Sequence, residues 1–139
     1  MSSPRDEARG ESRAFPRGQR LTRGADLAQV RLEGKRVRTA AMDVRAIASL
    51  SVSLRVGFVV PRYKQSAVAR NRLKRRLREL VRVEWLPALP PMDVVVRVIP
   101  PAYQRDFDAL RAELLQARER LARLPLPPRM LTHPTDPAV

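Results

Sequence analysis

Residues 66–85 restrict the fold of this chain more than any other segment, because they predict a long helix with two incompatible sides. One side carries an apolar stripe that must pack against other apolar groups. The other side is almost entirely basic, and Glu79 is the one carboxylate within residues 66–82. Like charges one turn apart destabilise a helix by about 0.2–0.5 kcal/mol per pair, so this side favours an external polyanion. The apolar stripe consists of Leu73, Leu77, Leu80 and Val81.

Two valine-rich runs flank this segment, and each predicts a buried strand. Residues 54–60 read Leu-Arg-Val-Gly-Phe-Val-Val and end at Pro61. Residues 93–99 read Asp-Val-Val-Val-Arg-Val-Ile and are closed by two prolines. Residues 37–50 alternate more weakly and predict further strand structure with an Ala-rich face.

Two more helices are predicted from apolar spacing. Residues 22–32 predict a short helix that stops at Gly34, and residues 104–124 predict a second long helix. The expected buried side of the short helix consists of Leu27, Val30 and Leu32, and that of the long helix of Phe107, Leu110, Leu114 and Leu121.

The order of these elements predicts the α+β class. Helix, two or three strands, helix, strand and helix correspond to α-β-β-β-α-β-α, a small α–β sandwich with helices covering one face of the sheet. The two valine-rich strands on either side of the central helix predict a β-α-β crossover. We expect one domain over residues 15–124, a disordered arm of mixed charge over residues 1–14 and a Pro-rich flexible tail over residues 125–139.

Net charge indicates the kind of partner. The formal net charge is +14 with a sequence pI of about 11.7, and arginine supplies most of the excess. Guanidinium groups bind phosphate in a bidentate way and stack on bases, which favours nucleic acid over an anionic membrane. The chain has no cysteine, which excludes disulfides and thiolate metal sites. The first residues lack a signal-peptide pattern, and we expect a cytoplasmic location.

The central helix also resembles a known family. Arg-Asn-Arg at residues 70–72, followed by Leu-Lys-Arg and then Leu-Arg-Glu at residues 77–79, resembles the signature helix of the bacterial ribonuclease P protein. Residues 55–60 resemble the family's Arg-Val-Gly strand, residues 20–27 its opening helix and residues 93–96 its last strand. The resemblance runs from about residue 15 to residue 124.

This resemblance implies the non-catalytic protein subunit of ribonuclease P. Such a subunit assists a catalytic RNA in the endonucleolytic removal of the 5′ leader from precursor tRNA, and its fold is shared with a ribosomal protein domain. The chemistry would be carried by the RNA and by magnesium ions held mainly by the RNA, with no organic cofactor. The implied partners are ribonuclease P RNA, with one protein per RNA, and the precursor tRNA leader, but no membrane.

The resemblance implies that the signature helix docks on the catalytic RNA, where its polar residues contact phosphates or help to organise magnesium ions. We add Arg82 from the outward side of the same helix, and Arg62 and Lys64 from the loop that enters it. The signature residues expected to bind RNA are Arg70, Asn71, Arg72, Lys74, Arg75 and Arg78.

A second site is implied between the first helix and the sheet, where a cleft would hold the single-stranded leader. Members of the family often place aromatic residues there, whereas this chain has Leu27, Arg31 and Arg45 at the matching positions. Arginine stacks on bases and binds phosphate, so we expect more electrostatic leader binding. Arg36 and Arg38 lie where the groove could continue. Core packing is the alternative for Leu27, and packing is also expected for Leu32 and Met42.

The sequence offers few groups for catalysis by side chains. His133 is the one histidine and lies in the Pro-rich tail. Asp106 and Asp108 stand at the start of the last predicted helix, where acidic residues favour the helix dipole. A Gly-rich phosphate loop is absent.

Other readings of the charge pattern remain open. A ribosomal or RNA-chaperone protein would share the charge and the fold but would have no role in tRNA processing. A peripheral membrane protein is disfavoured, because the leucines are needed for the core and no large apolar side chain is left on the basic side. A DNA-binding helix lacks a recognisable helix-turn-helix partner.

Overall fold

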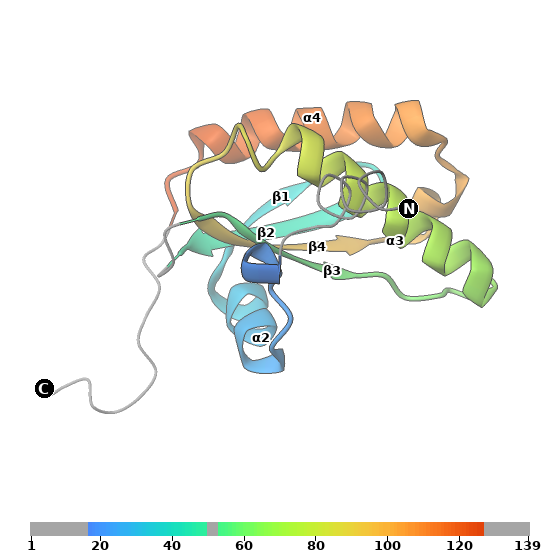
Figure 1. The fold of residues 1–139 in the computed structure, drawn as a ribbon, viewed down its shortest axis with the longest axis horizontal. Helices are drawn as coiled ribbons and strands as arrows, with labels where there is room; N and C mark the ends of the chain where they lie inside the picture. Colours follow the sequence, from blue (N-terminus) through green and yellow to red (C-terminus); the bar gives the residue numbers. More distant parts are fainter. Residues whose placement is uncertain (1–16, 50–52, 127–139) are drawn as a thin grey trace, which may run out of the picture.

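The computed structural model describes residues 17–49 and 53–126 (Figure 1). The predicted arm, and all but the first two residues of the predicted tail, lie outside these ranges. The order of the helices and strands confirms the predicted α-β-β-β-α-β-α arrangement. In chain order the elements are η1 (Arg17–Gln19), α2 (Gly24–Glu33), β1 (Lys35–Arg38), β2 (Met42–Ala48), β3 (Arg55–Val59), α3 (Ala67–Glu84), β4 (Met92–Val98), η2 (Pro100–Gln104) and α4 (Phe107–Arg123).

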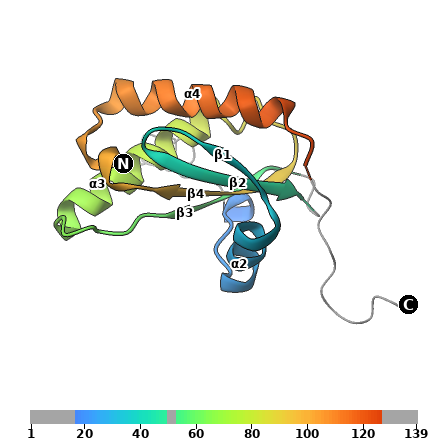
Figure 2. The ribbon, with the colours of Figure 1, turned by 180° about the vertical axis from the view of Figure 1, so that it is seen from behind.

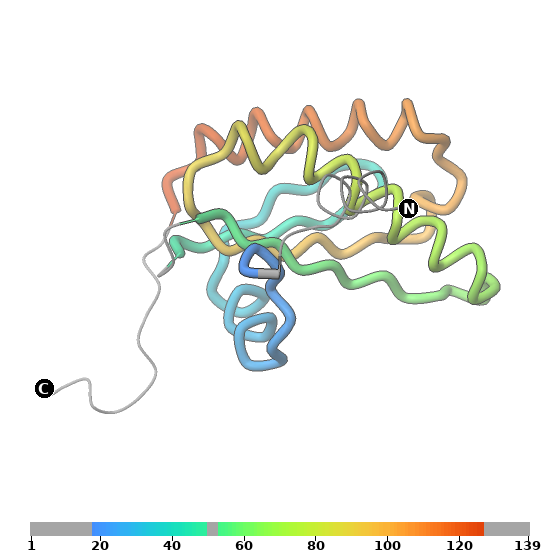
Figure 3. Tube along the Cα trace, viewed as in Figure 1, coloured from blue at the N-terminus to red at the C-terminus, as the bar shows by residue number. Residues whose placement is uncertain are grey.

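The strands form one sheet with the order β1-β2-β4-β3. The β1–β2 and β2–β4 pairs are antiparallel, and the β3–β4 pair is parallel. The chain leaves β3, passes through α3 and returns as β4, which confirms the predicted crossover (Figure 3). The weakly alternating segment 37–50 contributes to two strands, which meet at a turn where the Thr39 N–H donates to the Met42 carbonyl at 2.9 Å.

Alternation along the strands gives the sheet two different faces. Val37 pairs with Val44, which pairs with Val96, and this row belongs to the core beneath α3 and α4. Neighbouring residues in each strand point to the opposite face. There α2 packs through Val30 against Ile47. Figures 1 and 2 accordingly show α3 and α4 on one side of the sheet and α2 on the other.

The expectation that helices cover only one face is therefore wrong. An unbroken valine run in β4 supplies apolar side chains to both faces of a strand, and each face then needs its own cover. Val94 and Val96 lie in the core under α3 and α4, whereas Val95 lies in the smaller cluster under α2.

The long helices bury most of their predicted stripes. All four residues of the stripe on α3 are buried, as are Leu110, Leu114 and Leu121 on α4. The indole N–H of Trp85 donates to the Leu114 carbonyl at 2.9 Å and joins the end of α3 to α4. The prediction is wrong for Phe107, at the first position of α4, whose side chain is 40% exposed.

The short helix α2 buries less than predicted. Val30 is fully buried, but Leu32 is 83% exposed, so its predicted packing role is wrong. Residues two apart on a helix lie on different sides, and Leu32 cannot share the sheet-facing side of Val30. Met42 is buried, as expected.

A polar network holds α4 to the turn between β1 and β2. One carboxylate oxygen of Glu113 accepts from the Thr39 hydroxyl at 2.8 Å and from the Ala41 N–H at 3.0 Å. The other oxygen accepts from Arg105 Nε at 2.7 Å. Burial alone would raise the pKa of Glu113, but these hydrogen bonds outweigh it and hold the pKa below its ordinary value.

The depressed pKa of Glu113 predicts how stability varies with pH. A carboxyl group whose folded-state pKa is lowered stabilises the fold above its unfolded pKa, and the contribution disappears as the pH falls through the folded value. We expect Glu113→Gln to lower the free energy of unfolding at neutral pH and to flatten its decline below about pH 5. Urea unfolding over a pH series measures both effects. Glu119→Gln is the matched control, because Glu119 is exposed and its ion pair with Arg123 is long, at 3.8 Å. If the stability of Glu113→Gln declined at acidic pH as steeply as that of the unmodified protein, Glu113 would not be the group responsible for this decline.

Candidate functional site

A strained turn leads into the basic helix α3. Tyr63 and Lys64 have positive φ angles of 48° and 71°, and the Gln65 N–H donates to the Arg62 carbonyl at 2.8 Å. Residues with a Cβ adopt this left-handed conformation at a cost of roughly 1–2 kcal/mol each. The Tyr63 hydroxyl donates to the Val98 carbonyl at 3.0 Å and holds the turn against the end of β4. The turn leaves Arg62 and Lys64 exposed.

The outer side of α3 presents cations without counter-charges. Ser66 caps the helix by accepting from the Ala69 N–H at 3.0 Å, and the basic residues follow within the next turns. Within residues 17–49 and 53–126, an ion pair with a carboxylate is formed by none of Arg72, Lys74, Arg75, Arg76 and Arg78. Asn71, Arg72, Arg75 and Arg78 are exposed, and Lys74 and Arg76 are half-buried.

Two arginines of α3 are committed to partners within the protein. Arg70 Nε donates to the Val60 carbonyl at 2.7 Å, which ties the helix to the end of β3. Arg82 forms an ion pair with Glu79 at 2.7 Å, one turn away on the same helix. Their predicted contacts with RNA would compete with these bonds.

Lys74 shows that the charge on α3 is not balanced. Burial lowers its pKa, and the neighbouring cations Arg70 and Arg78 lower it further. A nearby carboxylate would have the opposite effect.

Arginines over α4, by contrast, are largely paired. Arg111 lies 2.8 Å from one oxygen of Glu84, and Arg118 lies 3.5 Å from the other. Arg105 is paired with Glu113 at 2.7 Å. The net positive charge is therefore concentrated away from this helix.

Register places a second group of arginines on the face of the sheet that α2 partly covers. One row pairs Arg36 with Arg45. The next row joins Arg38, Asp43 and Arg97 across three strands. Because successive side chains of a strand alternate between faces, both rows point away from the core beneath α3 and α4.

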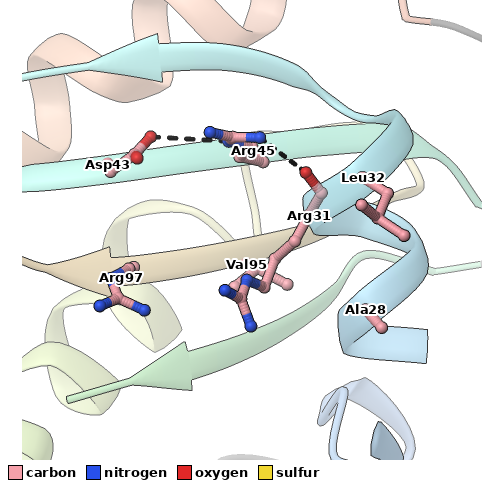
Figure 4. A pocket seen from close by; sticks show the side chains of 7 residues that line it. All are labelled: Ala28, Arg31, Leu32, Asp43, Arg45, Val95 and Arg97. Carbon is pink, nitrogen blue, oxygen red and sulfur yellow. Dashed lines mark hydrogen bonds and ion pairs between the residues drawn. The ribbon is translucent and has the colours of Figure 1, made fainter. Parts of the chain in front are cut away.

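These rows and α2 form a cleft with a volume of about 560 Å³ (Figure 4). Arg45 lines the cleft and is held in place, because its guanidinium donates to the Arg31 carbonyl at 2.6 Å and its Nε lies 3.8 Å from Asp43. Asp43 also accepts two hydrogen bonds from Arg36, at 3.1 and 3.2 Å. The described residues that line the cleft are Ala28, Arg31, Leu32, Asp43, Arg45, Val95 and Arg97.

The structure brings together most of the residues predicted for the cleft. Arg31 and Arg45 line it, Arg36 reaches it through Asp43, and Arg38 shares its face. Leu27 is not among the lining residues; it is partly buried and packs from α2 against the cluster of Leu21, Val30, Ile47 and Val95.

Sequence reasoning missed Arg97, which lines the cleft from β4. The signal was present, because Arg97 is spaced by two residues from Val95 and therefore shares its face. The unbroken valine run concealed this alternation.

Gly57 sets how closely the segment before α2 approaches β3. The Leu21 N–H donates to the Val56 carbonyl at 3.0 Å and extends the sheet beyond β3. A Cβ on Gly57 would lie 2.5 Å from the Leu21 carbonyl oxygen and 2.6 Å from Leu27 Cδ2. Both distances are shorter than van der Waals contact, so glycine is required for this packing.

Residues 17–49 and 53–126 contain neither a membrane-spanning helix nor a cluster of metal-ligating side chains. None of the helices there is both long enough and apolar enough to cross a membrane. In the same ranges, no three His, Asp or Glu side chains are grouped as metal ligands would be.

Fold and surface together define a small, basic α+β protein of the nucleic-acid-binding class. The family model for Ribonuclease P matches residues 15–122. The chain therefore belongs to the family of bacterial ribonuclease P protein components, as the strand at residues 55–60 and the signature helix indicated.

Individual relatives agree with this assignment. The ribonuclease P protein component of Streptomyces bikiniensis is 39% identical over 117 residues, covering 77% of this chain and 94% of that protein. That of Syntrophobacter fumaroxidans is 38% identical over 109 residues, covering 77% and 90%.

Solved structures show the same fold. The RNase P protein of Thermotoga maritima is 28% identical with a TM-score of 0.65, covering 76% of this chain and 97% of that one. The RNase P protein of Staphylococcus aureus, at 21% identity, is similar in fold with a TM-score of 0.67, covering 76% and 98%.

The close approach at Gly57 can be tested by adding one methyl group. We expect Gly57→Ala to destabilise the protein by about 1–3 kcal/mol, because overpacking forces the Leu21 segment away from β3. Chemical denaturation measures this loss. Gly24→Ala is the matched control, since no atom lies within 4 Å of a Cβ built there. Equal stability of the two variants would contradict the role of Gly57.

Proposed function

We propose that this chain is the RNA-binding protein subunit of ribonuclease P and assists a catalytic RNA in removing the 5′ leader from precursor tRNA. The observation that carries the proposal is the outer side of α3. There Arg72, Arg75 and Arg78 are exposed and form no ion pair with any carboxylate of the described chain. Phosphates of a folded RNA would supply the missing negative charge and release counterions on binding.

The arginine-lined cleft is proposed to hold the leader. A single strand exposes its phosphates and the faces of its bases, and Arg31, Arg45 and Arg97 can bind the phosphates. None of the described lining residues is aromatic. Leader binding would therefore depend on phosphate charge more than on base stacking.

Magnesium ions are proposed to be held by the RNA. A guanidinium group has five N–H donors and no acceptor, so the arginines of α3 do not fit as metal ligands. We assign no chemical step through the metal to these residues. Their role is to bind RNA phosphates, and no organic cofactor is proposed.

The proposed partners are one ribonuclease P RNA per protein and the precursor tRNA leader, in the cytoplasm. A ribosomal or RNA-chaperone protein would bind RNA through the same helix but would not stimulate leader removal. Mixing the protein with bacterial ribonuclease P RNA at low magnesium and measuring release of the leader separates these two functions.

The basic side of α3 makes a prediction about salt. The slope of log affinity against log salt concentration is negative, and each lost phosphate contact reduces its magnitude by about 0.7–0.9 units. We expect Arg72→Gln together with Arg75→Gln to reduce the magnitude of the slope for ribonuclease P RNA by roughly twice that amount. Filter binding over a salt series measures the slope. Arg111→Gln is the matched control, because Arg111 is already paired with Glu84. A slope unchanged in the double variant would refute the proposed binding surface.

The cleft makes a separate prediction about the leader. We expect Arg97→Gln to weaken binding of the holoenzyme to precursor tRNA by about threefold to tenfold, the effect of losing one typical hydrogen bond of about 0.5–1.5 kcal/mol. Affinity for tRNA without a leader should stay the same, because that RNA does not enter the cleft. Equal losses for both RNAs would mean that Arg97 acts elsewhere.

A further inference from the structure

One carboxylate lies among the arginines of the cleft. Asp43 belongs to β2 and is the one acidic residue that lines the cleft within the described part of the chain. A negative charge repels RNA phosphates, so charge alone would favour a different residue at this position. The Asp43 side chain is only 16% exposed, and little of its carboxylate is open to a bound strand. Its role must therefore lie in the residues that it binds.

Asp43 binds two arginines that would otherwise repel each other. Arg36 and Arg45 are directly opposite on β1 and β2, and like charges in such a pair destabilise a sheet. The Asp43 carboxylate accepts from Arg36 at 3.1 and 3.2 Å and lies 3.8 Å from Arg45 Nε. One carboxylate thus balances the pair and restrains both guanidinium groups.

The restrained Arg45 also joins β2 to α2. Its guanidinium donates at 2.6 Å to the carbonyl of Arg31, in the last turn of α2. Carbonyls in the last turn of a helix lack partners within the helix, and a cation there is favourable. Figure 4 shows Arg45 between Asp43 and the Arg31 carbonyl. A continuous series of bonds therefore runs from β1 through Asp43 and Arg45 to α2.

The other arginine side chains that line the cleft are not restrained in this way. Arg97 is directly opposite Asp43 across β2 and β4, but it forms no ion pair with a carboxylate of residues 17–49 and 53–126. The Arg31 side chain likewise has no carboxylate partner in these ranges, although its carbonyl is bound by Arg45. The bound arginines thus hold α2 in position, while Arg31 and Arg97 keep their charges for an anion.

We propose that Asp43 is a positioning residue for binding of the leader. By holding Arg36 and Arg45, it fixes α2 relative to β2. The phosphates of a single strand then meet Arg31 and Arg97 at a set spacing. Groups that are held in place before binding lose less conformational entropy when the ligand arrives. This inference rests on the proposed function in one respect, that the cleft holds the leader.

Asp43→Asn tests this role, because positioning and charge predict opposite results. Binding of the holoenzyme is measured to precursor tRNA and to tRNA without a leader, and the ratio of the two affinities gives the contribution of the leader. If Asp43 only repelled phosphates, removing its charge would raise this ratio. We expect the ratio to fall instead by about threefold to tenfold, the effect of losing one typical hydrogen bond. Asp108→Asn is the matched control, because it removes the same charge from the exposed first turn of α4, on the other side of the sheet.

A second variant tests the same bonds without changing the charge. Arg45→Lys keeps the cation, but an ammonium group lacks the planar fork that reaches both Asp43 and the Arg31 carbonyl. We expect it to lower the ratio as well, and it decides alone if Asp43→Asn does not fold. The double variant should lose less than the product of the two single losses, because Asp43 acts through Arg45. Thermal unfolding verifies that each variant folds.

The outcomes separate this inference from the proposed function. A ratio that rises or stays the same in Asp43→Asn would overturn the positioning role, since a merely structural defect weakens binding of both RNAs alike. A ratio unchanged in Arg45→Lys, or single losses that multiply in the double variant, would mean that Asp43 does not act through Arg45. If the unmodified holoenzyme binds both RNAs equally, the cleft does not hold the leader, and the proposed function of the cleft fails instead.

Discussion

The two faces of the sheet carry different side chains, apolar on one face and largely basic on the other. The positions of the helices and of the cleft depend on this difference. Valines such as Val44 and Val96 lie under α3 and α4, whereas the adjacent Arg45 and Arg97 lie in the cleft. A slip of one residue in β2 or β4 would turn Arg45 or Arg97 toward the core and Val44 or Val96 toward the cleft. Because an unpaired charge in an apolar core is very costly, the register is fixed wherever the two residue types alternate.

Carboxylates of the described chain largely hold structure together, which leaves the cations of α3 without partners. Asp93 is fully buried and accepts from Arg55 at 2.9 and 2.7 Å, where the ends of β3 and β4 meet. Glu113 joins α4 to the turn after β1, and Glu84 pairs with arginines of α4. The positive surface of α3 therefore results from the position of the carboxylates as well as from the excess of arginine, since most of the carboxylates described here are bound in structural contacts elsewhere.

Sequence alone predicts the helices and strands that pack against a large apolar surface. It is less accurate for residues at the edges of the core. The stripe of α3 lies wholly within the main core, among residues of the sheet and of α4, so its spacing identified every buried residue of the helix. A stripe indicates the side of a helix that faces the core but not how far the core extends, which is why Phe107 remains partly exposed. The three-turn α2 has too few residues to define a side, and Leu32 was misplaced. The spacing of Arg97 from Val95 shows that the two share a face, but strand pairing was needed to show that this face also carries Arg45.

The strand order also determines when the protein can fold during its synthesis. β4 lies between β2 and β3, yet it is made after both of them and after α3. Until residue 98 has left the ribosome, β2 and β3 each lack a neighbour, and the leucines of α3 have no complete sheet to cover them. Unpaired strand edges and exposed apolar surface promote aggregation. The nascent chain is therefore most vulnerable before its central strand emerges, and protection is complete only when α4 has followed and covered the rest of the core.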